Sequence, residues 1–205
     1  FKRKFKNAFL HWEDFGKDNA RRILDLFRKA HPSFNDDIQG TGAISLAAVL
    51  TGIKKSGLPT EKHRFCIFGA GTAGTGIADQ ICQALARIGN RSIEEVRKHF
   101  YLIDRHGLIR EGQSRTLDFQ RSYARKSAEI AGWQCSISGE CSLSDTVKNA
   151  GITVLIGCST ATGAFDFQIL KQMADNCDHP IILPLSNPTS KAEATPAEIF
   201  AATKG

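Results

Sequence analysis

A glycine-rich turn between two different hydrophobic patterns constrains the fold of this chain more than any other feature. A strand-like run at residues 63–68, apolar from Phe65 onward, leads directly into Gly69-Ala70-Gly71-Thr72-Ala73-Gly74, and apolar residues at helical spacing follow. This is Gly-x-Gly-x-x-Gly between a predicted strand and a predicted helix, where the first glycine permits a tight turn, the second lets the backbone approach a pyrophosphate, and the third allows close packing. The sequence therefore predicts that Gly69, Ala70, Gly71, Thr72, Ala73 and Gly74 bind a dinucleotide, in preference to forming a plain turn.

A carboxylate at the end of the next predicted strand supports this prediction. Asp104 follows Phe100-Tyr101-Leu102-Ile103 and is placed to bind ribose hydroxyls. It comes thirty residues after Gly74, later than usual, because a helix at 92–99 with a Ser92/Glu95 capping box intervenes. The alternative is a simple strand-end turn. Arg105 is compatible with a 2′-phosphate, but Asp104 favours NAD over NADP.

The rest of the chain alternates helical and strand patterns. Helices are expected at 17–30, 41–55, 121–131, 143–149, 165–177 and from 196, with further strands at 152–157 and 180–185. This order predicts an α/β fold with a doubly wound, Rossmann-type parallel sheet, helices on both faces, and a short helical segment in front. Gly69, Asp104, Gly157 and Asn187 all fall at carboxyl ends of predicted strands, where such sheets bind ligands.

Composition excludes several classes of protein. The 205 residues are 41% hydrophobic and 23% charged, with no apolar run long enough to span a bilayer, so no membrane partner is expected. The net charge of +6 is scattered among acids and accompanies no nucleic-acid-binding motif, so anionic small molecules are the expected partners. Six cysteines without a Cys-x-x-Cys pair predict reduced thiols in a cytoplasmic protein. The chain starts with Phe, and we expect a fragment of a longer protein.

Two acidic pairs precede the glycine loop. Glu13-Asp14 lies between aromatic residues, and Asp36-Asp37 follows Asn35 just before a Gly-Thr-Gly step. Adjacent carboxylates repel each other, so each pair is either a solvated loop or part of a site for a cation. Together the pairs indicate a site for a hard cation, although a helix of roughly 20 Å separates them and the flanking segments would have to fold back.

Four motifs occur in an order that resembles the malic enzyme family across essentially the whole chain. They are Trp12-Glu13-Asp14-Phe15-Gly16, Phe34-Asn35-Asp36-Asp37-Ile38-Gln39-Gly40-Thr41, Gly69-Ala70-Gly71, and Leu185-Ser186-Asn187-Pro188-Thr189. The second motif is highly specific. The resemblance implies that residues 1–34 end a substrate domain and that residues 35–205 form an NAD-binding domain. It is closest to the bacterial NAD-dependent and malolactic branches.

The resemblance also implies roles for individual residues. Glu13, Asp14 and Asp37 match the family's Mg²⁺ or Mn²⁺ ligands, with Asp37 also beside the cofactor, and Asp36 matches the carboxylate that supports the catalytic lysine. Asn187 matches the amide near substrate and nicotinamide, although an Asn-Pro turn is the simpler interpretation. The implied reaction is oxidation of malate by NAD⁺, followed by loss of CO₂ to give pyruvate.

The matching motifs leave the catalytic machinery incomplete. The family's base lysine, acid tyrosine and malate-binding arginine lie upstream of the matching motifs, and Lys17, Tyr101 and Tyr123 stand outside them. We therefore expect this chain alone to bind dinucleotide without turning over malate, and the longer enzyme to be a homo-oligomer. Two alternatives remain: a malolactic enzyme, which releases lactate, and a non-catalytic dinucleotide-sensing module.

Overall fold

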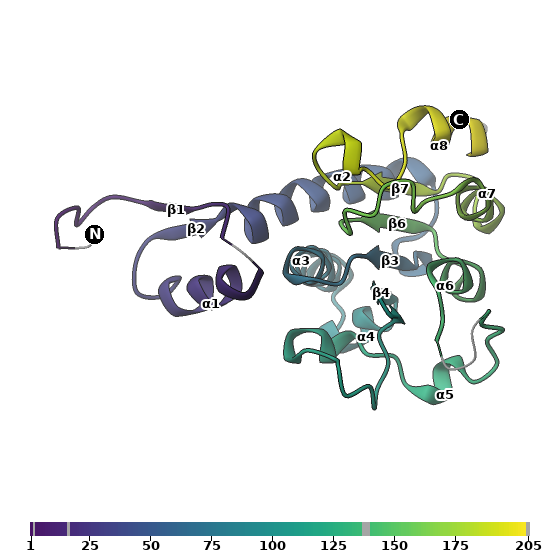
Figure 1. Ribbon diagram of the computed structural model, residues 1–205, viewed down its shortest axis with the longest axis horizontal. Coiled ribbons are helices and arrows are strands. Elements are labelled where there is room, and N and C mark those ends of the chain that lie inside the picture. The colour runs from purple at the N-terminus through teal and green to yellow at the C-terminus, as the bar shows by residue number, and fades with distance from the viewer. Residues whose placement is uncertain (2, 16, 137–139, 204–205) are drawn as a thin grey trace.

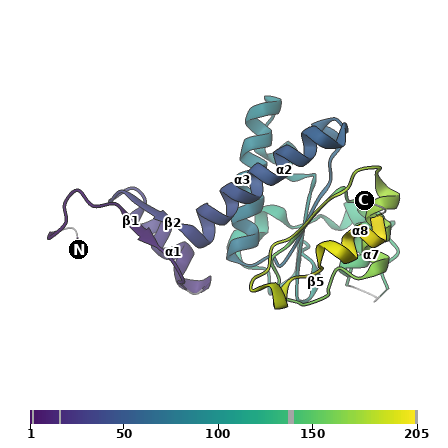
Figure 2. The ribbon, with the colours of Figure 1, turned by 90° about the horizontal axis from the view of Figure 1, so that it is seen from above.

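The structure is a computed structural model that describes residues 1, 3–15, 17–136 and 140–203. Its main body is a central sheet with helices on both sides, and an N-terminal segment extends from one end of that body (Figure 1). The view from above shows the same segment standing clear of the sheet (Figure 2). No helix within the described residues is long and apolar enough to cross a membrane.

The central sheet has the strand order β5-β4-β3-β6-β7. Four strands are parallel: β3 (Phe65–Phe68), β4 (Phe100–Asp104), β6 (Val154–Gly157) and β7 (Ile181–Pro184). The predicted parallel sheet is confirmed, with one addition. The short strand β5 (Gly107–Leu108) turns back and pairs antiparallel with β4 at the edge.

Strand β3 lies in the middle of this order, and the chain leaves it in both directions. It continues to β4 on one side and returns to β6 on the other, so the connections diverge between the ends of β3 and β6. A crevice forms at such a switch point because the loops after the two strands lead away from each other. The glycine loop follows β3 and therefore borders this crevice.

One face of the sheet is covered by α2 (Thr41–Ser56), α3 (Thr72–Gly89) and α4 (Ile93–Arg97). Alternate strand residues such as Ile67 and Leu102 pack against these helices in one cluster of buried side chains. The predicted capping box of α4 is present, since the Ser92 hydroxyl accepts from Glu95 N and the Glu95 carboxylate accepts from Ser92 N. A 3₁₀ turn, η2 (Thr60–Lys62), joins α2 to β3.

The opposite face is covered by α6 (Leu143–Ala150), α7 (Phe167–Asn176) and α8 (Pro196–Thr203), with η4 (Thr189–Lys191) after β7. Here Cys66 and Leu155 are the inward residues of their strands. Because the strands are buried on both faces, their sequences are continuously apolar. The sequence alone therefore indicated the parallel strands as short apolar runs.

The N-terminal segment is a small parallel unit of β1 (Leu10–Trp12), α1 (Lys17–Phe27) and β2 (Ser33–Asn35). Ala20 and Leu24 of α1 pack on Ile38 in a separate small cluster. After β2 the chain makes a π-helical turn, η1 (Asp36–Gly40), in which the Asn35 side chain accepts from Ile38 N, and then enters α2.

The helix predicted at 121–131 is wrong. The chain forms a 3₁₀ helix, η3 (Asp118–Tyr123), and one short turn, α5 (Ser127–Ile130), with extended backbone at Ala124 between them. Arg125 N donates to Ile109 O at 3.0 Å, and Glu111 N donates to Arg125 O at 3.0 Å. These bonds to a distant segment replace the helical bonds that the sequence pattern suggested.

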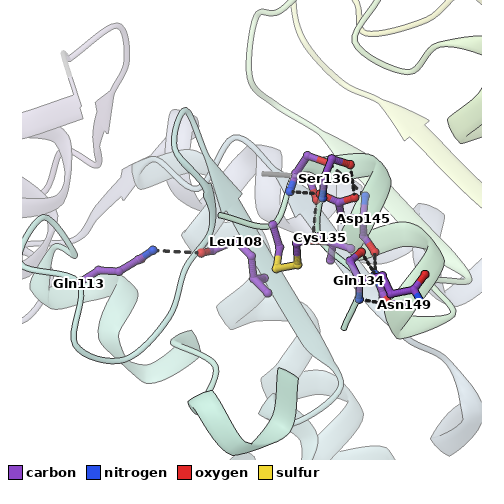
Figure 3. Close-up of a disulfide and its surroundings, with 10 residues drawn as sticks. Leu108, Gln113, Gln134, Cys135, Ser136, Asp145 and Asn149 are labelled. Carbon is purple, nitrogen blue, oxygen red and sulfur yellow. Dashed lines mark hydrogen bonds between the residues drawn. A yellow bond between two sulfur atoms is a disulfide. The ribbon is translucent and has the colours of Figure 1, made fainter. Parts of the chain in front are cut away.

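The expectation of reduced cysteines is also wrong for one pair, because Cys135 and Cys141 form a disulfide (Figure 3). The carboxylate of Asp145 accepts from Ser136 N at 3.1 Å and from Ser142 N at 2.9 Å. This carboxylate holds the residues next to both cysteines in place. The other four cysteines, at positions 66, 82, 158 and 177, are free.

Candidate functional site

A pocket of about 650 Å³ lies where the loops after β3, β4 and β6 meet. Its walls come from the glycine loop, from residues 104–106 after β4, and from residues 158, 159 and 161 after β6, while part of η3 lies across it. Its size suits a bound small molecule, and it lies at the carboxyl ends of three parallel strands. The sequence predicted a ligand site at this edge.

Gly69 and Gly74 are required by close contacts. Gly69 has a φ of +109°, and a Cβ there would lie 2.6 Å from the backbone carbonyl of Cys158. A Cβ at Gly74 would collide with the carbonyl oxygen of Gly69 and lie 2.9 Å from the sulfur of Cys158. Any larger residue at either position would therefore push the loop away from the end of β6.

Gly71 differs, because a Cβ there would have no heavy atom within 4 Å. It is exposed, it lines the pocket, and it is the N-cap of α3 without any side-chain capping bond. The positive N-terminal end of the 18-residue helix α3 therefore meets the pocket at Gly71, which has no side chain to fill the space in front of it. A phosphate group can approach such a helix end closely.

The remaining residues of the predicted loop divide into two groups. Ala70 and Thr72 line the pocket together with Gly69 and Gly71, whereas Ala73 and Gly74 lie in the first turn of α3 and do not line it. Contact with a ligand in this pocket is therefore expected from the first four residues of the motif, and close helix packing from the last two.

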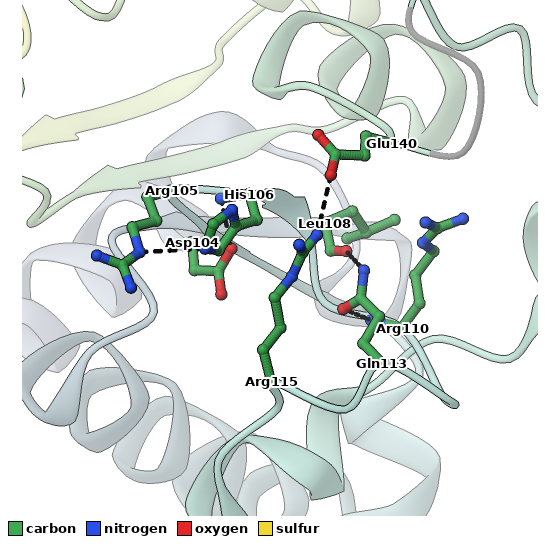
Figure 4. Close-up of polar contacts among 8 residues, drawn as sticks. All are labelled: Asp104, Arg105, His106, Leu108, Arg110, Gln113, Arg115 and Glu140. Atoms are coloured by element: carbon green, nitrogen blue, oxygen red, sulfur yellow. Dashed lines mark hydrogen bonds and ion pairs between the residues drawn. The ribbon is translucent and has the colours of Figure 1, made fainter.

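Asp104 lines the pocket and also makes the strand-end turn (Figure 4). Its Oδ1 accepts from His106 N at 2.7 Å, which keeps the side chain turned back over the start of the loop. Two guanidinium groups stand at the same mouth. Arg105 donates to the ring of His106 at 3.1 Å, and Arg115 donates to Glu140 at 3.0 Å.

Gln120 is a pocket residue that the sequence analysis missed. It is buried, and its side-chain amide donates to Ala70 O at 2.6 Å while its carbonyl oxygen accepts from Leu117 N at 2.9 Å. It thereby ties η3 to the glycine loop. Nothing in the local sequence signals the contact with Ala70, because Gln120 and Ala70 are fifty residues apart in the sequence.

Glu193 was missed as well, although it is fully buried. Its carboxylate accepts from Ser159 N and Ser159 Oγ, both at 2.8 Å, and from Ser186 Oγ at 2.6 Å. Ser159 lines the pocket after β6, and Ser186 follows β7, so Glu193 joins two loops at the functional edge. Asn187 comes next, is exposed, and does not line the pocket.

The thiol of Cys158 supports the loop instead of offering a nucleophile. Burial, reinforced by the Glu193 carboxylate, raises the pKa of Cys158 to about 12. The protonated sulfur donates to Gly69 O at 3.3 Å. A thiol with this pKa stays protonated near neutral pH and is correspondingly unreactive.

The acidic pairs are brought to one end of the small N-terminal sheet. Trp12 is paired with Asn35 across parallel strands, so Glu13-Asp14 and Asp36-Asp37 leave the sheet in the same direction. The chain thus folds back in the way that a shared site would require. Asp14 has a φ of +57°, a strained conformation for a non-glycine residue.

The side chains themselves are not gathered into a metal site. Glu13 and Asp14 are exposed, and the Oδ1 of Asp36 lies 3.5 Å from the Nε2 of His11. Within residues 1, 3–15, 17–136 and 140–203, no three His, Cys, Asp or Glu side chains are arranged to hold a metal ion. One observation does fit a cation: Asp37 Oδ2 is buried and has no hydrogen-bond partner among the described groups.

Comparison with known proteins identifies the family to which this chain belongs. The family model described as "Malic enzyme, NAD binding domain" matches residues 38–205. NAD-dependent malic enzyme 3 of Bacillus subtilis is 50% identical over 98% of this chain and 36% of that protein. The mitochondrial NAD-dependent malic enzyme of Saccharomyces cerevisiae is 44% identical over 97% of this chain and 29% of that protein.

A solved structure shows the same fold. The Entamoeba histolytica malic enzyme superposes with a TM-score of 0.74 at 26% identity, covering 98% of this chain and 39% of that one. The chain thus spans roughly a third of the length of the curated relatives that it matches. It belongs to the family of malic enzyme NAD-binding domains.

Proposed function

We propose that this chain is the NAD-binding part of an enzyme that oxidises malate and releases CO₂ and pyruvate. The observation that carries the proposal is the pocket on the glycine loop, with Asp104 at its mouth. The names of the relatives, NAD-dependent malic enzymes, support the choice of reaction. The malate substrate and the full reaction belong to a protein of which this chain would supply about a third.

The chain's own residues would orient the cofactor. Gly71 and the N-terminal end of α3 would hold the pyrophosphate, and Asp104 would accept hydrogen bonds from the adenosine ribose. A carboxylate at that position repels a 2′-phosphate, so NAD is preferred over NADP. When bound, NAD⁺ supplies the acceptor for the hydride of malate.

We also propose that Asp37, Glu13 and Asp14 hold Mg²⁺ or Mn²⁺ in the longer enzyme, with Asp36 supporting a lysine and Asn187 near the substrate. The unpartnered oxygen of Asp37 and the common direction of the acidic pairs support this set. Because the three carboxylates do not form one donor group here, other parts of the protein would have to complete the site. The isolated chain should therefore bind NAD⁺ without converting malate.

Calorimetric titration of the purified chain with NAD⁺ and NADP⁺ tests the pocket. We expect NAD⁺ to bind more tightly, and Asp104→Ala to weaken NAD⁺ binding by about tenfold, because it removes a charged hydrogen-bond acceptor. Asp118→Ala, which changes an exposed carboxylate outside the pocket, serves as the control. Unchanged NAD⁺ affinity in Asp104→Ala would show that the cofactor binds elsewhere.

A second assay addresses the incomplete catalytic site. The chain is mixed with malate, NAD⁺ and Mn²⁺, and NADH is followed by its absorbance. We expect no turnover, whereas steady NADH production would disprove the proposal that essential groups lie outside this chain. For the longer enzyme, pyruvate as product supports the malic reaction, and lactate without net NADH would identify a malolactic enzyme.

A further inference from the structure

A second pocket, of about 440 Å³, lies between α1 and the outer sides of α2 and α3. It shares no lining residue with the cofactor pocket. Its residues on α3 run from Gly76 to Arg87, whereas the cofactor pocket touches that helix only at Thr72. The helix rises by about 1.5 Å per residue, so Arg87 lies roughly 22 Å along α3 from Thr72.

Three arginines line this pocket, with a single carboxylate among them. Arg21 is on α1, Arg28 follows it, and Arg87 is in the last turn of α3. The carboxylate, Asp79, is already engaged, since its Oδ1 accepts from Tyr123 OH at 2.8 Å and its Oδ2 lies 3.7 Å from Arg21. Positive charge therefore exceeds negative charge in this cavity.

Arg28 and Arg87 contribute most of this excess. Both are exposed, and neither has an ion-pair partner in the part of the chain that the structure describes. Arg21 is more enclosed, with 36% of its side chain exposed, and also pairs with Asp25 at 3.1 Å. A fork of guanidinium donors on facing elements is suited to bidentate contacts with phosphate or carboxylate oxygens.

The pocket also has an apolar side. Leu24, Phe34, Ile38 and Leu46 line it, and Gln83 adds an amide near the arginines. A ligand that suits both surfaces is a small organic anion, with two or more negative charges at the arginines and a short apolar portion over the hydrophobic side chains.

A simpler role exists for two of the arginines. Arg28 and Arg87 are at the C-terminal ends of helices, where a cation stabilises the helix dipole. That role does not account for Arg21 in the middle of α1, or for all three residues lining one cavity. The C-terminal end of each helix carries about half a negative charge, which repels an anion. Full guanidinium charges would therefore be needed for an anion to bind here.

We propose that the pocket formed by Arg21, Arg28 and Arg87 binds a compact organic dianion, separately from the cofactor. Phosphate esters and dicarboxylates share the required chemistry. The site joins the N-terminal segment to the Rossmann-type body, because α1 provides one wall and α3 the other.

Calorimetry on the 205-residue chain tests this proposal, with glycerol 3-phosphate as the phosphate-ester probe and succinate as the dicarboxylate probe. Each titration is done with and without saturating NAD⁺. Because NAD⁺ would occupy the cofactor pocket, a probe that still binds in its presence binds outside the glycine loop. The test variant carries Arg28→Glu and Arg87→Glu. The control carries Arg22→Glu and Lys55→Glu, two exposed cations outside this pocket with the same total change of charge.

We expect at least one probe to bind in the presence of NAD⁺, and the test variant to weaken its binding by about tenfold or more. The control should change the affinity by less than about threefold, since exposed charges at a distance are screened. The probe that binds identifies the phosphate or the carboxylate class. Absence of binding for both probes, or equal losses in the two variants, overturns the proposal. Circular dichroism of both variants verifies that they are folded.

Discussion

The glycine loop and the two acidic pairs both follow the ends of parallel strands, yet different interactions hold them. The glycine loop is fixed from several sides by Gln120, by the Cys158 thiol and by the close approach of Gly74 to Gly69. Glu13 and Asp14 are exposed at the end of a two-stranded sheet, and Asp37 keeps a buried oxygen without a partner.

The difference follows from the chemistry of each ligand site. A phosphate site made from backbone N–H groups and a helix end carries only partial charges, so it can be packed into a sheet without a ligand. A cation site made from carboxylates carries full like charges that repel until the cation arrives. We therefore expect the proposed phosphate site to be complete within this chain, whereas the proposed cation site has only its backbone arranged.

The largest effect is expected at Gly74. In Gly74→Ala, the new methyl group meets the Gly69 carbonyl and the Cys158 sulfur, which should cost about 3 kcal/mol of unfolding free energy and abolish NAD⁺ binding. Urea denaturation and calorimetry measure the two losses.

Gly71→Ala is the matched control, because its methyl group has open space around it. Its stability should stay within about 0.5 kcal/mol of the parent, while NAD⁺ binding weakens because the methyl group stands where a pyrophosphate would approach. Normal NAD⁺ affinity in Gly71→Ala would contradict the preformed phosphate site.

A smaller loss is expected at Glu193, which joins the loops after β6 and β7. Glu193→Ala leaves Ser159 N and the hydroxyls of Ser159 and Ser186 without their acceptor, at a cost of about 2 kcal/mol in unfolding free energy. Glu193→Gln keeps one acceptor oxygen and should lose less. Equal stability of Glu193→Ala and the parent in urea would show that these loops are held by other contacts.

The folded state should lose stability at low pH partly because of a histidine at the N-terminal ends of the parallel strands. Burial lowers the pKa of His63, whose ring contacts Thr153 Oγ1 at 3.0 Å and Ser56 Oγ at 3.2 Å. The neutral ring is favoured in the fold, while the unfolded chain takes up a proton below its ordinary pKa of about 6.5. Stability is thus fully present above that pH and declines as the pH falls below it.

The slope from this one histidine is at most about 1.4 kcal/mol per pH unit. His63→Gln should flatten the stability profile below about pH 6.5, and His179→Gln, which changes an exposed histidine, serves as the control. Burial also lowers the pKa of His99, so part of the slope should persist in His63→Gln. Identical profiles for the parent and His63→Gln would rule out this origin.

The smallest effect is expected in the acidic region. Asp37→Asn should change the unfolding free energy by less than about 0.5 kcal/mol, because losing a carboxylate with no partner also removes its repulsion with Asp36. Thermal denaturation with and without Mn²⁺ measures it. Strong stabilisation of the parent by Mn²⁺, lost in Asp37→Asn, would show that this chain already holds a complete metal site.

Local sequence determined the four parallel strands of the main sheet, most of the helices around it and the position of the glycine loop. The strands are apolar runs buried on both faces, and the caps at Ser92 and Thr195 depend on a glutamate three residues later. The glycines at 69, 71 and 74 are meaningful because a strand precedes them and a helix follows. Propensity, periodicity and contacts over three or four residues are readable without a fold.

Only the tertiary structure decided which side chains complete and support the site. Gln120 reaches Ala70 across fifty residues, Glu193 reaches Ser159 across thirty-four, and Arg125 breaks the helix predicted at 121–131 by bonding to Ile109 and Glu111. The three-arginine pocket also depends on neighbours brought together by packing. Such contacts are set by the geometry of whole elements, and no local pattern in the sequence encodes them.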